Sequence, residues 1–330
     1  MANIETTYLG MKLKSPIIVG SSPLTQDVES IVRLEKAGAG AVVLKSLFEE
    51  QIMMDVDALR MNNMHDAFSD AENYISYFTK EKNVNDYLEL IRESKKRTNI
   101  PIIASINCKN AGEWIGFAKK LEDAGPDALE LNIFNIPANP EFTGGDYEKV
   151  YFDILQELTQ KISIPVAVKL APYFSGLANF ATRLCHSKID GLVMFNRFYE
   201  PDVDIEKMEV VSKSFHSLSS DNSLALRWAG ILSPIINCDI CCSTGIVNGE
   251  TMIKNLLVGA NVVMMVSQVL KDGPELITKM NQELKDWMLQ NKLESTKEFI
   301  GKLSQKNVKK PIIFERSQFM RYFHDADYVK

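Results

Sequence analysis

The sequence predicts a closed barrel of eight parallel strands surrounded by helices, the TIM (β/α)8 fold. Four helix-like stretches end in small residues and run within two or three positions into an apolar segment, as in KAGAGAVVL and LVGANVVMM. Glycine near a helix end supplies the left-handed cap, and apolar runs without alternation are typical of parallel strands covered on both faces. Eight such strands can be counted, and that number favours closure over an open doubly wound sheet.

Strands and helices alternate along the chain in the order that this fold requires. Two of the strand segments, NIPIIASI and SIPVAVKL, have a proline at their start, where its missing N–H does least harm. Amphipathic spacing predicts the helices between the strands. The expected strands centre on Ile17, Val42, Ile103, Leu129, Ala167, Val193, Ile240 and Val263, and the expected helices cover Val28–Lys36, Asp86–Lys96, Glu113–Glu122, Tyr147–Thr159, Glu250–Leu257 and a closing Gly273–Gln290.

We expect a single domain over residues 1–330 with two insertions and a C-terminal tail. Met53–Thr79 is rich in methionine and aromatic residues, and Arg197–Asn222 is polar and becomes serine-rich toward its end. Both follow the carboxyl ends of strands, the face that carries the active site in this fold. The tail, Ser295–Lys330, is expected to pack over the barrel or against a second subunit.

Composition and charge restrict the classes of function. Hydrophobic residues make up 45% and charged residues 24%, which is ordinary globular usage. The net charge of −6 argues against a broad electrostatic grip on nucleic acid or on an anionic membrane. The N-terminal MANIETTYLG has no basic segment followed by an apolar one, and no apolar run reaches the length of a membrane span. We therefore expect a cytoplasmic protein that acts on a small molecule.

The cysteines indicate neither a disulfide framework nor a metal site. There are five in a long chain, an odd number. Cys238, Cys241 and Cys242 are spaced by three and one within a short apolar run and have no nearby histidine. This pattern favours buried strand thiols over a set of zinc ligands.

Polar residues gather where the predicted strands end. Two buried strands run into a lysine, at VVLK and VAVK, and a buried ammonium is unfavourable unless it meets an anion or several acceptors. Near the last two strands, Ser-Thr-Gly precedes a helix at the place where this fold commonly binds phosphate. Several asparagines suit the edge of a flat heterocycle. Phosphate and heterocycle together favour a nucleotide-like cofactor, of which FMN is the simplest.

In these segments the sequence resembles the dihydroorotate dehydrogenase family, in particular its soluble class 1 enzymes. The resemblance covers nearly the whole chain and depends on LKSPIIVGSSPL, GAGAVVLKSL, PIIASIN, DALELN, IPVAVKLAPYF, the asparagine of FNRFY, STGI and MMVSQVLKDGP, in this order. It implies a barrel that binds FMN, with the flavin accepting hydride from a substrate stacked on its ring. It also implies a homodimer and a role in pyrimidine biosynthesis.

The resemblance also implies roles for individual positions. Flavin contacts are implied for Ser21, Ser22, Lys45, Ser46, Asn107, Asn132, Lys169 and Phe195, phosphate contacts for Thr244, Gly245, Val266 and Ser267, and substrate contacts for Lys45, Asn132 and Asn196. Each has a structural alternative: a serine is also a cap, an asparagine a turn residue, and Phe195 a core residue. The two lysines are the hardest to explain structurally.

The chain departs from the family at three places. The family carries a cysteine or serine base in a loop that reads LNLSCPN, and here LNIFNIPAN places Asn135 at that position. An amide has no useful proton affinity, so Asn135 is not expected to act as a base. Cys108, which follows the third strand, is the candidate to replace this base, with inert packing the favoured role. The family's Asn and Met-Gly-Leu pattern is missing from Met61–Asn73, and SLALRW replaces a glycine-rich approach to the flavin phosphate.

Two functions and one remote alternative follow from this. The first is an FMN-dependent oxidoreductase that transfers hydride between FMN and dihydroorotate or a related small ring or unsaturated acid. The second is a flavin-binding electron-transfer subunit that works with a redox partner protein and does not turn over dihydroorotate. Its iron–sulfur centre would lie in the partner, since the chain has no four-cysteine cluster spacing. A barrel that has lost flavin is disfavoured by Lys45, Lys169 and the STG turn.

Overall fold

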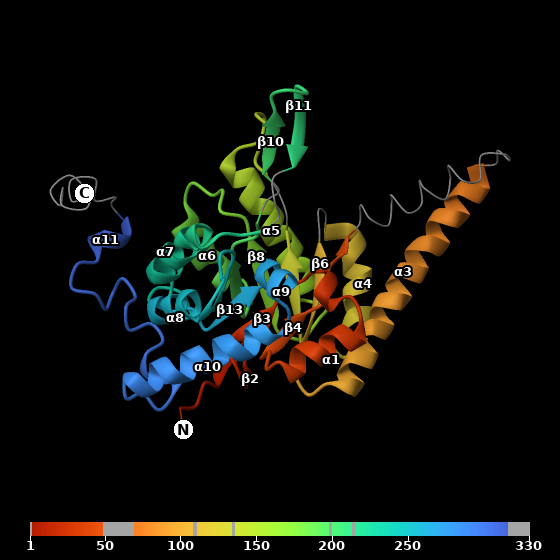
Figure 1. Cartoon of the computed structure of the whole chain (residues 1–330). Helices are drawn as coiled ribbons and strands as arrows, with labels where there is room; N and C mark the ends of the chain where they lie inside the picture. Colours follow the sequence, from red (N-terminus) through yellow and green to blue (C-terminus); the bar gives the residue numbers. More distant parts are fainter. Residues whose placement is uncertain are drawn as a thin grey trace.

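A computed structural model describes residues 2–48, 69–107, 111–133, 136–197, 200–212 and 216–315. All barrel strands pair in parallel, and the pairing of β13 with β3 and of β4 with β6 joins the ends of the sheet into a ring (Figure 1). The short β5 (Leu47–Phe48) adds to the edge of β6. The barrel strands are β3 (Ile17–Val19), β4 (Ala41–Val43), β6 (Ile102–Asn107), β7 (Ala128–Asn132), β8 (Val166–Leu170), β9 (Gly191–Met194), β12 (Asp239–Ser243) and β13 (Val262–Met265). All eight predicted strands are confirmed.

The predicted helices are also present, and local sequence explains where several begin and end. The Asp27 side chain accepts a hydrogen bond from Ser30 N at the start of α1, and Asn248 accepts one from Thr251 N at the start of α8. Gly259 ends α8 with φ +119°, the left-handed cap expected of a glycine. The helices are α1 (Val28–Lys36), α3 (Ser69–Arg97), α4 (Ala111–Asp123), α5 (Gly144–Leu158), α6 (Leu177–Cys185), α7 (Asn222–Leu232), α8 (Gly249–Val258), α9 (Ser267–Asp272) and α10 (Glu275–Gln290).

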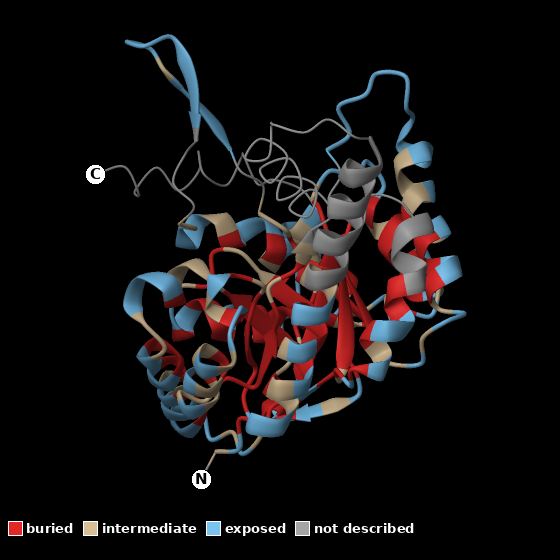
Figure 2. Cartoon of the chain, turned by 90° about the vertical axis from the view of Figure 1, so that its right-hand side faces the viewer, coloured by how far each residue is buried: buried red, intermediate tan, exposed pale blue. Residues whose placement is uncertain are grey.

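The apolar core has two parts. One lies between the strands and the surrounding helices, and the other fills the interior of the barrel. The buried strands stand out at the centre of the molecule in Figure 2. A small hairpin of β1 (Thr6–Tyr8) and β2 (Met11–Leu13) contributes Tyr8, Leu9 and Leu13 to the interior cluster. The hairpin therefore closes the amino end of the barrel.

The insertion Arg197–Asn222 contains an antiparallel hairpin in addition to the predicted polar loop. Its strands are β10 (Pro201–Asp204) and β11 (Glu209–Ser212), and it projects from the barrel (Figure 1). Large apolar side chains at Ile205, Met208 and Val210 are exposed on it. In the other insertion, Met53–Thr79, residues 53–68 lie outside the described residues, and 69–79 form the beginning of α3.

The tail packs over the barrel as far as it is described. Gly301 N donates to Leu256 O (3.0 Å) and Gln305 N donates to Gly230 O (2.9 Å), so the segment runs across α7 and α8. It contains the short helices η3 (Thr296–Glu298) and α11 (Ile312–Glu315). Residues 316–330 lie outside the described part of the chain.

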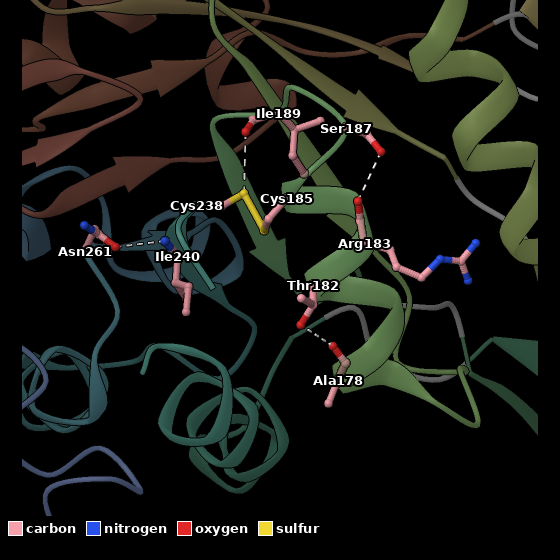
Figure 3. The surroundings of a disulfide bond; sticks show 9 residues. All are labelled: Ala178, Thr182, Arg183, Cys185, Ser187, Ile189, Cys238, Ile240 and Asn261. Carbon is pink, nitrogen blue, oxygen red and sulfur yellow. Dashed lines mark hydrogen bonds between the residues drawn. A yellow bond between two sulfur atoms is a disulfide. The ribbon is translucent and has the colours of Figure 1, made fainter. Parts of the chain in front are cut away.

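One prediction about the cysteines is wrong. Cys185, at the end of α6, and Cys238, just before β12, form a disulfide with a Cα–Cα distance of 5.6 Å (Figure 3). Cys238 is therefore not a free thiol, whereas Cys241 and Cys242 are free and buried. The partner lies 53 residues away and is adjacent only because β9 and β12 are neighbours, which spacing within one strand does not reveal. Among the described helices, none has the length and apolar character that crossing a membrane requires.

The disulfide makes a prediction about thiol content. In protein purified without reductant and then denatured, a thiol reagent should titrate three of the five cysteines, because Cys185 and Cys238 are bonded to each other. After reduction it should titrate all five. The Cys185→Ser/Cys238→Ser variant should show the same three thiols in both conditions and should lose about 2–4 kcal/mol of unfolding free energy in urea. Five reactive thiols in the unreduced wild type would contradict the assignment.

Candidate functional site

The carboxyl ends of neighbouring strands bring three serines into contact. The Ser21 and Ser46 hydroxyls lie 2.9 Å apart, and those of Ser46 and Ser105 lie 2.7 Å apart. Ser46 N donates to the Ser21 hydroxyl (2.7 Å), and Ser105 N donates to Tyr87 OH (2.8 Å). Hydroxyl groups rotate and can donate or accept. The chain of serines is thus a preformed polar wall that can adapt to either kind of partner.

Three amide and ammonium side chains continue this wall along adjacent strands. Asn107 on β6 is in register with Asn132 on β7, which in turn is in register with Lys169 on β8. All three are buried. Asn196, after β9, donates from Nδ2 to Asn132 Oδ1 (2.8 Å). The predicted asparagines and Lys169 are therefore brought together, and this arrangement suits a ligand with both donors and acceptors along one edge.

Lys169 carries a charge into this site. Its side chain is buried, and the described partners of its ammonium are Glu130 Oε1 and Met264 Sδ, each 3.8 Å from Nζ. Both distances are longer than those of a good hydrogen bond from a charged donor. A buried ammonium is stable only when its charge is matched and its N–H groups are bonded. Lys169 is hence poised to meet an electron-rich ligand.

The Thr244–Gly245 turn forms the opposite part of the site. Both residues have left-handed backbone angles, φ +75° and +74°, which for a β-branched threonine is uncommon. A Cβ on Gly245 would lie 2.4 Å from Asn222 N, so the turn is packed directly against the start of α7. Thr244 Oγ1 donates to Phe195 O (3.1 Å), and Asn222 Nδ2 donates to Thr244 O (3.2 Å). These contacts hold the turn in place after β12.

Ser267, at the start of α9, faces a residue that the sequence did not single out. Its hydroxyl lies 2.8 Å from that of Ser217 and also accepts from Ser217 N (3.2 Å). The segment that follows Ser217 reaches the turn as well, since a Cβ on Gly245 would lie 2.8 Å from Leu218 O. Two hydroxyls and the Thr244–Gly245 turn therefore surround one small region, as a phosphate site requires.

Several predicted residues are placed in structural roles as well. Ser22 Oγ donates to Gly20 O (3.0 Å) and accepts from Leu24 N (3.3 Å), so it caps a short helix, η1 (Pro23–Thr25). The Phe195 side chain is buried in the apolar core, while its carbonyl accepts from Thr244. Lys45 is only partly buried, and its Nζ lies 3.5 Å from Gln26 Oε1. Val266 approaches the carboxyl end of β3, where a Cβ on Gly20 would meet its Cγ2 at 3.0 Å.

Glu130 was missed by the sequence analysis, although its signal was visible. It stands between two leucines in the apolar strand β7 and is 1% exposed. Burial raises the pKa of its carboxyl, and the nearby Lys169 opposes that rise. A charged residue inside a strand that reads ALELN is as informative as one at the strand end. Cys108, the candidate replacement for the base, and Asn135, at the position of the family base, lie outside the described residues.

A cavity of about 430 Å³ lies at the other end of the barrel, beside Cys238, Asp239 and Asn261. The side chains of Asp239 and Asn261 are already paired. Asp239 accepts from Leu9 N (2.7 Å) and from Asn261 Nδ2 (2.8 Å), and Asn261 Oδ1 accepts from Ile240 N (2.8 Å; Figure 3). Such groups at the amino ends of barrel strands serve stability, so the candidate site is at the carboxyl ends. Among the described residues, no cluster of three or more metal-ligating side chains occurs.

Comparison with known proteins agrees with this geometry. The family model for dihydroorotate dehydrogenase matches residues 3–288. The chain is 26% identical over 314 residues to the catalytic subunit of dihydroorotate dehydrogenase B (NAD(+)) of Thermoplasma volcanium, covering 91% of this chain and 98% of the relative. It is 26% identical over 310 residues to the catalytic subunit from Methanocaldococcus jannaschii, covering 90% and 97%. It is 24% identical over 322 residues to dihydroorotate dehydrogenase A (fumarate) of Lactococcus lactis subsp. cremoris, covering 91% and 99%.

A glycine substitution tests the packing of the Thr244–Gly245 turn. Gly245 and Gly10 have the same φ of +74°, but nothing lies within 4 Å of a Cβ on Gly10. Gly10→Ala should therefore lose only the conformational contribution, about 1 kcal/mol. Gly245→Ala should lose a further 1–3 kcal/mol or so, because the methyl group meets the backbone of Asn222. Urea unfolding of both variants measures the difference, and equal losses would show that the turn is not packed as described.

Proposed function

The chain belongs to the dihydroorotate dehydrogenase family, and we propose that it is an FMN-dependent oxidoreductase that acts on the CH–CH bond of dihydroorotate or a related small ring or unsaturated acid. Family membership follows from the family model, which spans residues 3–288. The cofactor and the substrate class are the proposed part, since the relatives are about a quarter identical to this chain.

The buried Lys169 ammonium is the observation that carries the proposal. It lies at the carboxyl end of β8, in register with Asn132, and its described contacts are both 3.8 Å long. A buried ammonium with weak local partners favours a ligand that is, or becomes, negative. An isoalloxazine ring meets this description, because its polar edge accepts hydrogen bonds and gains negative charge on reduction.

The rest of the site fits the remaining parts of FMN. The Ser217 and Ser267 hydroxyls and the Thr244–Gly245 turn are suited to hold the phosphate. Gly20 is packed closely against Met264 and Val266, since a Cβ at this position would lie 2.9 Å from the Met264 side chain. We assign the flavin contacts to Ser21, Ser46, Asn107, Asn132 and Lys169. FMN, when bound, supplies a two-electron acceptor for hydride.

Around the cofactor, the polar side chains position the substrate. The hydrogen bond from Asn196 to Asn132 fixes both amides, so that each keeps a defined orientation toward a small ring. We assign Asn132 to both ligands and Asn196 to the substrate. Lys45 follows β4 on the same face and is assigned to a substrate carboxylate, for which it would leave Gln26. The Lys169 ammonium would stabilise the negative charge that the flavin ring gains on reduction.

The alternative function, a flavin-binding electron-transfer subunit, would use the same site. The position of the family base is occupied by Asn135, which has no useful proton affinity. In addition, two of the relatives are named catalytic subunits, a name that implies further subunits. We therefore keep a redox partner protein and a homodimer as proposals, together with a cytoplasmic location. The exposed apolar β10–β11 hairpin supports a partner surface, because isolated two-stranded hairpins are marginally stable in water.

Replacing Lys169 should weaken FMN binding. Lys169→Gln removes a charge-assisted contact, so the Kd for FMN should rise about ten- to hundredfold, as flavin fluorescence quenching would show. Lys302→Gln, at an exposed lysine on the tail, is the matched control and should bind like the wild type. Lys169→Gln leaves the buried Glu130 without its cation. The Lys169→Gln/Glu130→Gln variant removes both charges and tests FMN binding without an unpaired carboxylate. Wild-type affinity in both would remove Lys169 from the cofactor site.

Because the family base is missing, we expect slow oxidation of dihydroorotate and a faster reaction when a base is restored at position 135. Loss of general-base help lowers rates about 10²–10⁴-fold, so the FMN-loaded wild type should oxidise dihydroorotate slowly. Asn135→Cys and Asn135→Ser should raise the steady-state rate, since they restore the residue types of the family. Asn135→Ala serves as the control and should gain nothing. Rapid turnover by the wild type would mean that another residue is the base, and no turnover in any form would favour the electron-transfer alternative.

A further inference from the structure

A buried carboxylate in the barrel interior has no part in the reaction as proposed above. Glu130 lies on β7, two residues before Asn132, and its side chain is almost completely buried. Oε1 has no hydrogen-bond partner within the described part of the chain. Its described ion pair is with Lys169 Nζ at 3.8 Å. An unsatisfied carboxylate oxygen this deep in a protein is unfavourable, so a reason for its presence is needed.

The other groups around Glu130 do not supply a second charge. The titratable groups on which Glu130 acts electrostatically are Tyr8 of the amino-end hairpin, Tyr87 of α3 and Cys241 of β12. Burial raises the pKa of each of these three groups well above neutrality, so all are uncharged at physiological pH. Lys169 is the one cation that acts on Glu130 among the described residues. Glu130 and Lys169 therefore form an isolated pair with a net charge of zero when both are ionised.

We propose that Glu130 compensates charge for the flavin site: when FMN on the Lys169 side is reduced, Glu130 takes up one proton from solvent, so that the net charge of the site is unchanged. This inference rests on the proposed function. The substrate transfers hydride, two electrons and one proton, and the flavin ring thereby gains one negative charge. The proton on Glu130 is additional, and it converts the carboxylate into a neutral acid.

Electrostatics gives the direction of this change. In the oxidised state, the Lys169 ammonium favours the ionised form of Glu130 against the effect of burial. After reduction, the same ammonium faces two negative charges in a region of low dielectric constant. The new charge raises the pKa of Glu130, since like charges disfavour ionisation. Between the two pKa values, reduction and protonation occur together.

The pH dependence of the flavin midpoint potential tests this proposal without any measurement of turnover. Uptake of one proton per two electrons shifts the potential by about 30 mV per pH unit, and uptake of two protons shifts it by about 59 mV per pH unit. Reductive titration of the FMN-loaded wild type with redox dyes should show the steeper slope over part of the range from about pH 5 to about pH 9. A slope near 30 mV throughout would overturn the proposal.

A variant distinguishes charge compensation from a purely structural role. Glu130→Gln should keep the shallow slope at every pH, because its side chain cannot take up the second proton. Its potential should equal that of the wild type at acid pH and exceed it increasingly as the pH rises, since the variant never carries the carboxylate charge. A role limited to holding Lys169 would shift the potential by the same amount at all pH values, and that result would contradict us.

Controls separate this inference from the proposed function. Tyr8→Phe removes another buried group whose hydroxyl lacks a hydrogen-bond partner among the described residues, and it should keep the steep slope of the wild type. A shallow wild-type slope refutes the role of Glu130 even if Glu130→Gln does not fold. Protein that takes up no FMN would refute the proposed function itself, whereas bound FMN with a shallow slope would refute only the role of Glu130.

Discussion

The pairing of β4 with β6 is the constraint on which the rest of the structure depends. Val42 and Val43 pair with Ile102 and Ile103, and this contact turns an open parallel sheet into a ring. Only in a ring do the carboxyl ends of first and last strands face one another. The serines after β3 and β4 then meet Ser105 of β6 as a chain of hydroxyls, and Lys169 comes to lie beside Met264 of β13. Barrel closure thus assembles the site from residues that are far apart in sequence.

The two ends of the barrel treat polar groups differently. At the amino end, Asp239 and Asn261 satisfy each other and the backbone of the N-terminal hairpin. Toward the carboxyl end, Glu130 Oε1 lacks a hydrogen-bond partner within the described chain. Its ion pair with Lys169 Nζ is 3.8 Å long. Satisfied groups add stability, whereas weakly paired buried charges reduce it. The fold is therefore stabilised at one end and keeps its binding capacity at the other.

Patterns within single segments made the fold predictable from sequence. Short apolar runs located all eight barrel strands, four of them after helix-like stretches that end in small residues, and the strand-end lysine of VAVK located a buried ammonium. Two contacts between distant segments were missed, the Cys185–Cys238 disulfide and the contact of Ser217 with Ser267. The β10–β11 hairpin was also missed, although it is local. Glu130 was missed for a different reason: it lies in the middle of an apolar strand, whereas the predicted site residues lie at strand ends. Lys45 shows a further limit, since a position at a strand end does not fix where a long side chain rests.

The account as a whole requires that this chain holds a flavin. The most direct measurement is a visible spectrum of the wild-type protein after incubation with FMN and removal of the unbound cofactor by gel filtration. The account predicts yellow protein with one FMN per chain and an absorption band altered from that of free FMN. Colourless protein that has been shown to be folded would contradict it.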